Sequence, residues 1–246
     1  MSKLSIITVV KNDATALQNT LDSIQLQNYK DFEHIIIDGK SNDNTINVLK
    51  EFSAYPIQTI SEQDNGVYDA MNKGLVLAKS QWLLFLNAGD LFVDQNALGS
   101  WMQNCRDEYD FIYCDVYRAQ DNQSKKLWVQ KSPIEYKWYR NICHQALLYN
   151  RQKLGSFRYD TSYAISADFH LLLKILTQRS NLSYLKIEKV FLEYKIGGIS
   201  QKYAMKALNE RWKSFDSLIE NKLLKVWNYL NLSRQILRQF LTQCSQ

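Results

Sequence analysis

Polar residues follow several apolar runs of the sequence, at the points where the strands of a sheet would end. The most informative group is residues 87–90, because Asp90 closely follows the apolar run 82–86. A hard divalent cation that binds a diphosphate is commonly held by one or two protein carboxylates, which would project from such a strand end. Asp90 could equally cap the turn before Leu91, and its position alone leaves both interpretations open. The other groups are residues 8–12, 38–41 and 61–66.

Two residues of the second half also have side chains suited to chemistry. Asp168 would lie in the first turn of an expected helix, residues 168–176. There it would act as a general base, or it would only be stabilised by the helix dipole, by about 0.3–1 kcal/mol. His144 precedes an expected strand, where it would contact a metal, a phosphate or a substrate, or have only a structural role. We interpret His34 and His170 as structural.

An alternation of strands and helices would position these groups. Buried strands are expected at residues 4–10, 33–38, 58–61 and 82–86, with helices beginning near residues 13, 43 and 67 between them. Such repeats form a parallel sheet with right-handed crossovers, and ligands bind at the carboxyl ends of its strands. The second half predicts strands at 111–116, 146–149 and 185–191, a helix from about residue 202, and another near residue 233. The sequence therefore predicts an α/β fold.

The order of these motifs resembles the inverting family 2 glycosyltransferases, which have the GT-A fold, and especially their bacterial polysaccharide-assembly members. Residues 5–9 resemble the opening strand of that family, and residues 37–45 its second-strand motif. Residues 61–74 are the longest and most specific match. The likeness covers about residues 3–200. It implies a Rossmann-like, mostly parallel sheet flanked by helices, followed in this chain by a C-terminal helical extension.

The resemblance also implies roles for single residues. Asp90 stands in the metal-binding Asp-x-Asp motif and would bind Mg²⁺ or Mn²⁺ bridging the two donor phosphates. Many relatives carry aspartates where this chain has Asn87 and Gly89. Asp168 would be the catalytic base, and Asp38 would accept a hydrogen bond from the ring N–H of uracil. The other residues expected to contact the nucleotide-sugar are Thr8, Val10, Asp64, Lys73, Asn87, Ala88, His144 and Gly198, with Thr8 at the base and Lys73 near the phosphates.

The implied reaction is a single in-line displacement with inversion at the anomeric carbon. The base takes the proton of an acceptor hydroxyl, a step that typically contributes about 10²–10⁴ in rate, while the nucleoside diphosphate leaves from the opposite face. A metal and cationic side chains stabilise the charge on the leaving group. We expect a UDP-sugar donor and a glycan or lipid-linked oligosaccharide acceptor, in the synthesis of surface polysaccharide.

Several other functional classes lack their sequence signature. The loop after the first strand, residues 11–14, has neither the glycine fingerprint of dehydrogenases and P-loop proteins nor the Gly-rich, Arg-containing loop of nucleotidylyltransferases. A nucleic-acid binder would spread its basic residues over the folded body. The remaining alternative is a catalytically inactive module that binds a nucleotide-sugar or glycan. Retention of four aspartates (Asp38, Asp64, Asp90 and Asp168) favours the enzyme.

The charge of the chain is concentrated near its end. The net charge is +5, and residues 201–246 carry eight Lys/Arg against three Asp/Glu. We therefore divide the chain into a glycosyltransferase domain, residues 1–200, and a basic amphipathic helical tail, residues 201–246. Within the domain, residues 1–95 would bind the nucleotide and residues 96–200 the acceptor. The paired glycines 197 and 198 are interpreted as a lid over the donor rather than an ordinary turn.

The tail has two possible partners. A basic helix with aromatic residues suits an anionic membrane surface, at about 1 kcal/mol per basic residue. Alternatively it packs on the catalytic domain or on a second subunit of a homodimer. We favour packing for the helix from residue 202 and membrane contact for the last one. No signal peptide or stretch of about eighteen apolar residues is evident, and four scattered cysteines indicate reduced thiols. These features predict a cytoplasmic protein, peripheral on the inner face of the plasma membrane.

Overall fold

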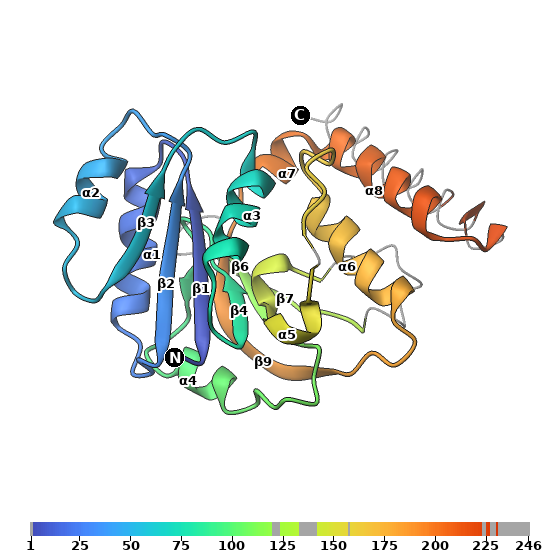
Figure 1. The fold of residues 1–246 in the computed structure, drawn as a ribbon, viewed down its shortest axis with the longest axis horizontal. Helices are drawn as coiled ribbons and strands as arrows, with labels where there is room; N and C mark the ends of the chain where they lie inside the picture. Colours follow the sequence, from blue (N-terminus) through green and yellow to red (C-terminus); the bar gives the residue numbers. More distant parts are fainter. Residues whose placement is uncertain are drawn as a thin grey trace.

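A nine-stranded sheet runs through the protein in the computed structural model, with helices on both of its faces (Figure 1). The structure describes residues 2–119, 124–132, 142–156, 158–222, 225–226 and 230. The strand order is β3-β2-β1-β4-β8-β6-β9-β5, and β7 pairs with β6 beside this path. The segments of both halves of the chain thus belong to one sheet.

The first half alternates strands and helices as the sequence predicts. Strands β1, β2, β3 and β4 pair in parallel, so their carboxyl ends meet at one edge of the sheet. The bounds are β1 Leu4–Val10, α1 Ala14–Gln25, β2 Phe32–Asp38, α2 Thr45–Glu51, β3 Ile57–Ser61, α3 Val67–Leu77 and β4 Trp82–Phe85.

The second half completes the sheet with strands of both directions. Strands β6 and β9 run the same way as β1 to β4, whereas β5, β7 and β8 run the opposite way. The expected mostly parallel sheet is thereby confirmed. The bounds are β5 Leu91–Phe92, α4 Ala97–Met102, β6 Phe111–Ala119, β7 Lys125–Trp128, the 3₁₀ turn His144–Ala146, β8 Leu147–Asn150, α5 Arg151–Leu154, α6 Ala167–Gln178, β9 Tyr184–Lys195, α7 Ile199–Lys202 and α8 Ala204–Leu218.

Two hydrophobic cores lie on the two faces of the sheet. Successive side chains of a strand point to opposite faces, so Ile7 packs with α3 and α6 while Ile6 packs with α4. Gly74 on α3 allows the closest approach of helix and sheet, since a Cβ atom there would lie 2.4 Å from Cγ2 of Ile7. Helix α3 therefore packs closely against β1 on this face of the sheet.

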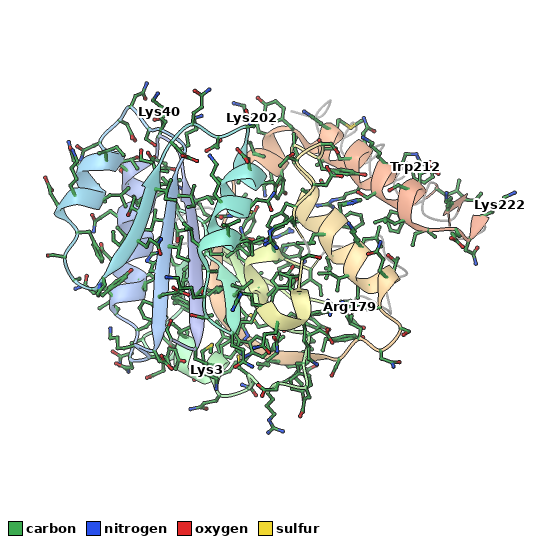
Figure 2. All side chains as sticks on the ribbon, viewed as in Figure 1. Lys3, Lys40, Arg179, Lys202, Trp212 and Lys222 are labelled. Atoms are coloured by element: carbon green, nitrogen blue, oxygen red, sulfur yellow. The ribbon has the colours of Figure 1, made fainter. Side chains whose placement is uncertain are left out.

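The start of the predicted tail packs on the rest of the protein. Phe215 and Ile219, on and just after α8, join Phe169 and Leu173 of α6 in one apolar cluster. This confirms packing for the first tail helix. The basic side chains Lys202 and Lys222 are exposed near the two ends of this region (Figure 2). Among the described residues, no helix is long and apolar enough to cross a membrane. The helix expected near residue 233 lies outside the described residues, and the domain boundaries at 95 and 200 stay predictions.

Candidate active site

A cavity of about 1030 Å³ opens at the carboxyl ends of the strands. Its walls come from the loop after β4, the turn before β8, the start of α6, the segment after β9, and helix α8. Six of the predicted site residues line it, namely Asn87, Ala88, Asp90, His144, Asp168 and Gly198. The structure thus brings the expected metal ligand and the expected base, 78 residues apart in sequence, to the same cavity.

Asp90 is nearly fully buried at this cavity, with 3% of its surface exposed. Its Oδ1 accepts a hydrogen bond from the backbone N–H of Lys195, at 3.2 Å. Burial raises the pKa of Asp90 to about 7, against the hydrogen bonds from Lys195 and the side chain of Gln145. A bound cation would act in the opposite direction and favour the ionised carboxylate. Asp90 therefore lines the cavity and is also part of the turn before Leu91.

The loop that carries Asp90 is held by a residue that sequence reasoning missed. Thr20 of α1 is buried; its hydroxyl accepts from the N–H of Gly89 at 2.9 Å and lies 3.0 Å from the carbonyl oxygen of Asp90. A threonine in a helix gives no sequence signal of such a contact, because its partners lie about 70 residues further along the chain.

Asn87 supplies a second oxygen beside Asp90. Its Oδ1 is buried and has no hydrogen-bond partner in the described part of the chain. Buried polar atoms are normally paired, so an unpaired oxygen on a residue that lines the cavity suits a ligand. Carboxylate and amide oxygens are hard donors of the kind that Mg²⁺ and Mn²⁺ take, with phosphate and water completing the shell. No group of three His, Cys, Asp or Glu side chains is assembled for a metal among the described residues. The pair fits a metal shared with a diphosphate.

Lys195 explains the departure from the family motif at Gly89. Gly89 has a positive φ of 98°, and a Cβ atom there would lie 2.8 Å from Cδ of Lys195. An aspartate at this position would meet both backbone strain and the lysine stem. The ammonium group of Lys195 lies 3.8 Å from the carboxylate of Asp13, at the edge of the cavity. The charge of Lys195 also acts to lower the pKa of Asp90, against the effect of burial.

Asp168 is the second residue of α6 and faces the cavity. Its Oδ1 lies 2.8 Å from the hydroxyl of Tyr68, which also lies 2.8 Å from the carbonyl oxygen of Ile165. Burial, and next the charge of Asp168, raise the pKa of Tyr68 well above its usual value. The hydroxyl therefore keeps its proton and donates to one of these oxygens at a time. Tyr68 lies within the motif 61–74, but it has no predicted role there.

His144 both lines the cavity and makes an internal hydrogen bond. Its Nε2 is bonded to the hydroxyl of Tyr159, and its ring lies 4.9 Å from the ring of Phe85, centroid to centroid. Burial lowers the pKa of His144, which favours the neutral ring. His34 is bonded to Thr8 and Tyr55, and His170 stacks on Tyr163.

Thr8, Val10 and Asp38 lie at the same sheet edge but do not line the cavity. Thr8 is fully buried, and its hydroxyl donates to the carbonyl of Leu86 at 2.7 Å. Asp38 is also fully buried and accepts from the N–H and hydroxyl of Ser41 and the hydroxyl of Ser61. Neighbouring residues bond to the polar atoms of both side chains in this structure, and a contact of either with the base stays a prediction. In this structure Asp38 joins the loop after β2 to the end of β3, and Thr8 joins β1 to Leu86, just after β4.

Asp64 and Lys73 are likewise outside the cavity. Asp64 lies against Gly39, where a Cβ atom would be 2.4 Å from its Oδ2, and it accepts from the N–H of Gly66 at 3.0 Å. Lys73 is paired with Glu62 at 2.8 Å, and this partner raises its pKa. The expected contact of Lys73 with donor phosphates would require it to leave Glu62. A nucleotide contact at Asp64 stays a prediction.

The comparisons with known proteins agree with this geometry. Residues 5–171 match the family described as Glycosyl transferase family 2. The chain belongs to this family. It is 31% identical to the PGL/p-HBAD biosynthesis glycosyltransferase of Mycobacterium tuberculosis over 202 residues, which cover 80% of this chain and 78% of the relative. It is also 23% identical to the Escherichia coli UDP-Glc:alpha-D-GlcNAc-diphosphoundecaprenol beta-1,3-glucosyltransferase WfgD, covering 93% of this chain and 91% of that one.

Solved structures show that this family 2 glycosyltransferase has the GT-A fold. Staphylococcus aureus TarS superposes with a TM-score of 0.67 at 14% identity, over 94% of this chain and 42% of TarS. The chain therefore spans less than half of the TarS length. The mannosyltransferase PcManGT from Pyrobaculum calidifontis, in complex with GDP-Man and Mn²⁺, superposes with a TM-score of 0.66 at 16% identity, over 89% of this chain and 65% of that one.

Two arginines of this glycosyltransferase also border the cavity and had no predicted role. The guanidinium of Arg118 lies 3.6 Å from the ring centroid of Trp128, and Arg211 comes from α8. Arg211 was assigned to the tail, outside the family likeness, and only the folding of α8 onto α6 brings it to the site.

Proposed function

We propose that the protein is an inverting glycosyltransferase that moves a sugar from a nucleotide-sugar, with UDP favoured, to a hydroxyl of a glycan or lipid-linked acceptor. The observation that carries this is one cavity, in a family 2 glycosyltransferase, lined by both Asp90 and Asp168. Inversion needs one base and one leaving-group site on opposite sides of the reacting carbon. Two separate carboxylates at a cavity supply both.

Each of these residues has its own role in the proposed reaction. Asp168 takes the proton of the acceptor hydroxyl as that oxygen attacks the anomeric carbon, and the bond to the nucleoside diphosphate breaks on the opposite face. Tyr68 orients the carboxylate of Asp168 through its hydroxyl. Asp90 and Asn87 would hold Mg²⁺ or Mn²⁺. When bound, the metal supplies positive charge for the departing diphosphate. Lys195 adds a second positive charge at that wall.

The choice of substrates rests on the relatives. WfgD is described as using UDP-Glc and a GlcNAc-diphosphoundecaprenol acceptor, and TarS has been solved with UDP and with UDP-GlcNAc. PcManGT was solved with GDP-Man and Mn²⁺. For this chain we propose a UDP-sugar, a divalent metal and an acceptor of surface polysaccharide or glycolipid synthesis. We also propose action in the cytoplasm, with the helix predicted near residue 233 contacting the anionic inner face of the plasma membrane.

Nucleotide binding is the first test of this function. UDP, GDP, dTDP and CMP are added to the purified chain with and without Mn²⁺, and the unfolding temperature is measured. A ligand at 100 times its Kd adds about 2.7 kcal/mol of stability, which is a visible shift. We expect a shift with UDP that Mn²⁺ enlarges. A shift with GDP alone would keep the transferase and change the donor.

The inactive binding module predicts a different pattern. It would bind a nucleotide-sugar or a glycan without turning it over, so donor hydrolysis in the absence of acceptor separates it from the enzyme. Release of UDP from UDP-glucose or UDP-GlcNAc, lost in Asp168→Asn, supports the transferase. Absence of both turnover and nucleotide binding would exclude it.

A further inference from the structure

The carboxylate of Glu210, on α8, lies against the backbone that leads into α6. Its Oε1 accepts from the N–H of Ala164 at 3.0 Å, and its Oε2 accepts from the N–H groups of Ile165 and Ser166 at 2.8 and 2.9 Å. Glu210 is only 9% exposed. Hydrogen bonds to an ionised acceptor are about twice as strong as neutral ones, so three of them hold this segment firmly.

Ser166 makes a second connection to the same helix. It is the N-cap residue of α6, but its side chain makes no capping hydrogen bond. Its hydroxyl instead donates to the carbonyl oxygen of Ala207 on α8, at 3.1 Å. Both the backbone and the side chain of the residue that starts α6 are therefore held by α8, in addition to the apolar contact of the two helices.

The segment that α8 holds is next to the proposed base in the sequence. Asp168 follows Ser166 by two residues, and the carbonyl of Ile165 shares the Tyr68 hydroxyl with Asp168. A shift of segment 164–166 would move both Asp168 and the group that orients it. We propose that Glu210 is a positioning residue for Asp168, so that α8 is part of the active site. The inference rests on the proposed function, in which Asp168 is the base.

Glu210→Gln tests this role with little change of size. The amide oxygen of glutamine can still accept hydrogen bonds from two of the three N–H groups. The amide nitrogen then faces the third N–H group, and two donors cannot form a hydrogen bond with each other. Since a misplacement of 1 Å can cost about 10²-fold in rate, we expect kcat for UDP-sugar turnover to fall about tenfold or more. The Kd for UDP should stay within about twofold, because the phosphate and metal residues are untouched. Glu220→Gln, at an exposed site just beyond α8, is the matched control.

The outcomes separate positioning from mere stability and from the proposed function. A wild-type kcat in Glu210→Gln, with Asp168→Asn inactive, overturns the inference. Turnover that survives in Asp168→Asn instead overturns the assignment of the base. If Glu210→Gln does not fold, Ser166→Ala removes only the bond to Ala207 and should still lower kcat without changing the Kd for UDP. An unchanged kcat in that variant also counts against the inference.

The neighbouring Arg211 carries a second inference from a different observation. Its side chain borders the cavity, and its Nε is buried with no hydrogen-bond partner among the described residues. Its guanidinium carbon lies 5.6 Å from the ring centroid of Phe169, the residue that follows Asp168. A buried unpaired donor is costly unless a ligand supplies an acceptor.

The charges that line the cavity indicate which chemical group would accept a hydrogen bond from Arg211. Four cationic side chains line it (Arg118, Lys131, Lys195 and Arg211) against three carboxylates (Asp13, Asp90 and Asp168), and a metal would add further positive charge. A planar guanidinium matches phosphate oxygens, which it can bind through two parallel hydrogen bonds. We infer that Arg211 binds a phosphate group of a substrate, either in the diphosphate of the donor or next to the sugar of a diphosphate-linked acceptor.

Arg211→Gln distinguishes these two sources. We measure the Kd for UDP with Mn²⁺, and the Kd for GlcNAc linked through diphosphate to a short lipid or linked directly as a neutral glycoside. A charged hydrogen bond contributes about 1.5–3 kcal/mol, so its loss should weaken the affected ligand about tenfold or more. Weaker UDP binding identifies the donor diphosphate. Weaker binding of only the diphosphate-linked acceptor identifies the acceptor.

Lys206→Gln is the matched control, since Lys206 is an exposed cation on the same helix. Unchanged affinity for UDP and for the diphosphate-linked acceptor in Arg211→Gln overturns the inference. If the wild-type chain does not bind the acceptor probe, the Kd for UDP alone decides, and an unchanged value overturns it. A wild-type chain that binds no nucleotide at all contradicts the proposed function rather than the role of Arg211.

Discussion

The hydroxyl of Tyr68 lies 2.8 Å from Oδ1 of Asp168, joining residues that are 100 positions apart. Tyr68 belongs to α3, which Gly74 holds close to the sheet, and Asp168 belongs to α6, which α8 holds from the other side. The contact therefore depends on how α3 and α6 are placed relative to each other. It also gives a direct way to test whether that placement serves the reaction.

Tyr68→Phe should lower the rate more than it lowers stability. Loss of the hydroxyl removes a hydrogen bond of about 0.5–1.5 kcal/mol and frees the carboxylate of Asp168 to rotate. We expect kcat for donor turnover to fall about tenfold with the Kd for UDP unchanged. Tyr55→Phe is the control, because its hydroxyl is bonded to His34 away from the cavity. Equal rates in both variants would show that the contact is only structural.

Asp168→Asn should abolish turnover while donor binding persists. An amide is almost isosteric with the carboxylate but cannot take a proton, so the contribution of the base, about 10²–10⁴ in rate, is lost. The measurement is UDP release at saturating donor, together with calorimetry of UDP. Turnover at the wild-type rate would move the base to another residue.

Asp90→Ala should remove the metal-dependent part of nucleotide binding. The wild-type protein is expected to gain more thermal stability from UDP with Mn²⁺ than from UDP alone, and the variant to gain the same from both. Asn87→Ala should reduce the difference without abolishing it, because Asn87 offers an uncharged oxygen. Asp94→Asn, an exposed carboxylate of the same loop region, is the control. A full Mn²⁺ effect in Asp90→Ala would place the metal elsewhere.

Gly74→Ala should destabilise the protein although alanine is the better helix former. The propensity gain is about 1 kcal/mol, whereas overpacking a core costs about 1–3 kcal/mol. The new Cβ would lie 2.4 Å from Cγ2 of Ile7, a fully buried side chain of the central strand β1. Gly99→Ala on α4 is the control. The new Cβ atom would have no neighbour nearer than 3.6 Å, so this change should stabilise the protein. Urea unfolding of both variants measures whether the free energy of unfolding falls in Gly74→Ala and rises in Gly99→Ala.

Stability should depend on pH through His34. Burial lowers the pKa of this residue to about 3, so the unfolded chain binds a proton below about pH 6.5 that the folded chain does not. His34 therefore causes a loss of up to about 1.4 kcal/mol per pH unit as pH falls from 6.5 towards 3. The pKa of Asp90, raised to about 7, acts in the opposite direction in the metal-free protein.

The contribution of His34 is isolated by difference. His34→Gln should lose less stability than the wild-type protein between pH 6.5 and 5, in urea unfolding without added metal. Both proteins keep Asp90, so its effect cancels. Identical slopes in the two proteins would show that His34 is not held neutral by the fold.

The sequence by itself determined the first half of the sheet, and it predicted two carboxylates, Asp90 and Asp168, that the structure places at one cavity. Continuous apolar runs such as residues 4–10 predict buried strands because burial on both faces leaves no alternation. The two-residue β5 and the exposed β7 were missed, since elements this short have no periodic pattern and form only against β9 and β6. Asp90 and Asp168 could be predicted because a family motif fixes their place along the chain, and their roles stay predictions.

Only the tertiary structure decided which side chains meet. The bonds of Thr20 to the Asp90 loop, of Tyr68 to Asp168, and of Glu210 to residues 164–166 join positions about 45 to 100 apart. The same applies to Thr8 and Asp38, whose polar atoms bond to neighbouring loops and strands in this structure. Strand and helix patterns arise from local burial, whereas hydrogen bonds between distant segments depend on how the finished elements pack. The sequence therefore predicted the class of reaction. The packing of α3, α6 and α8 decided which residues contact the predicted base.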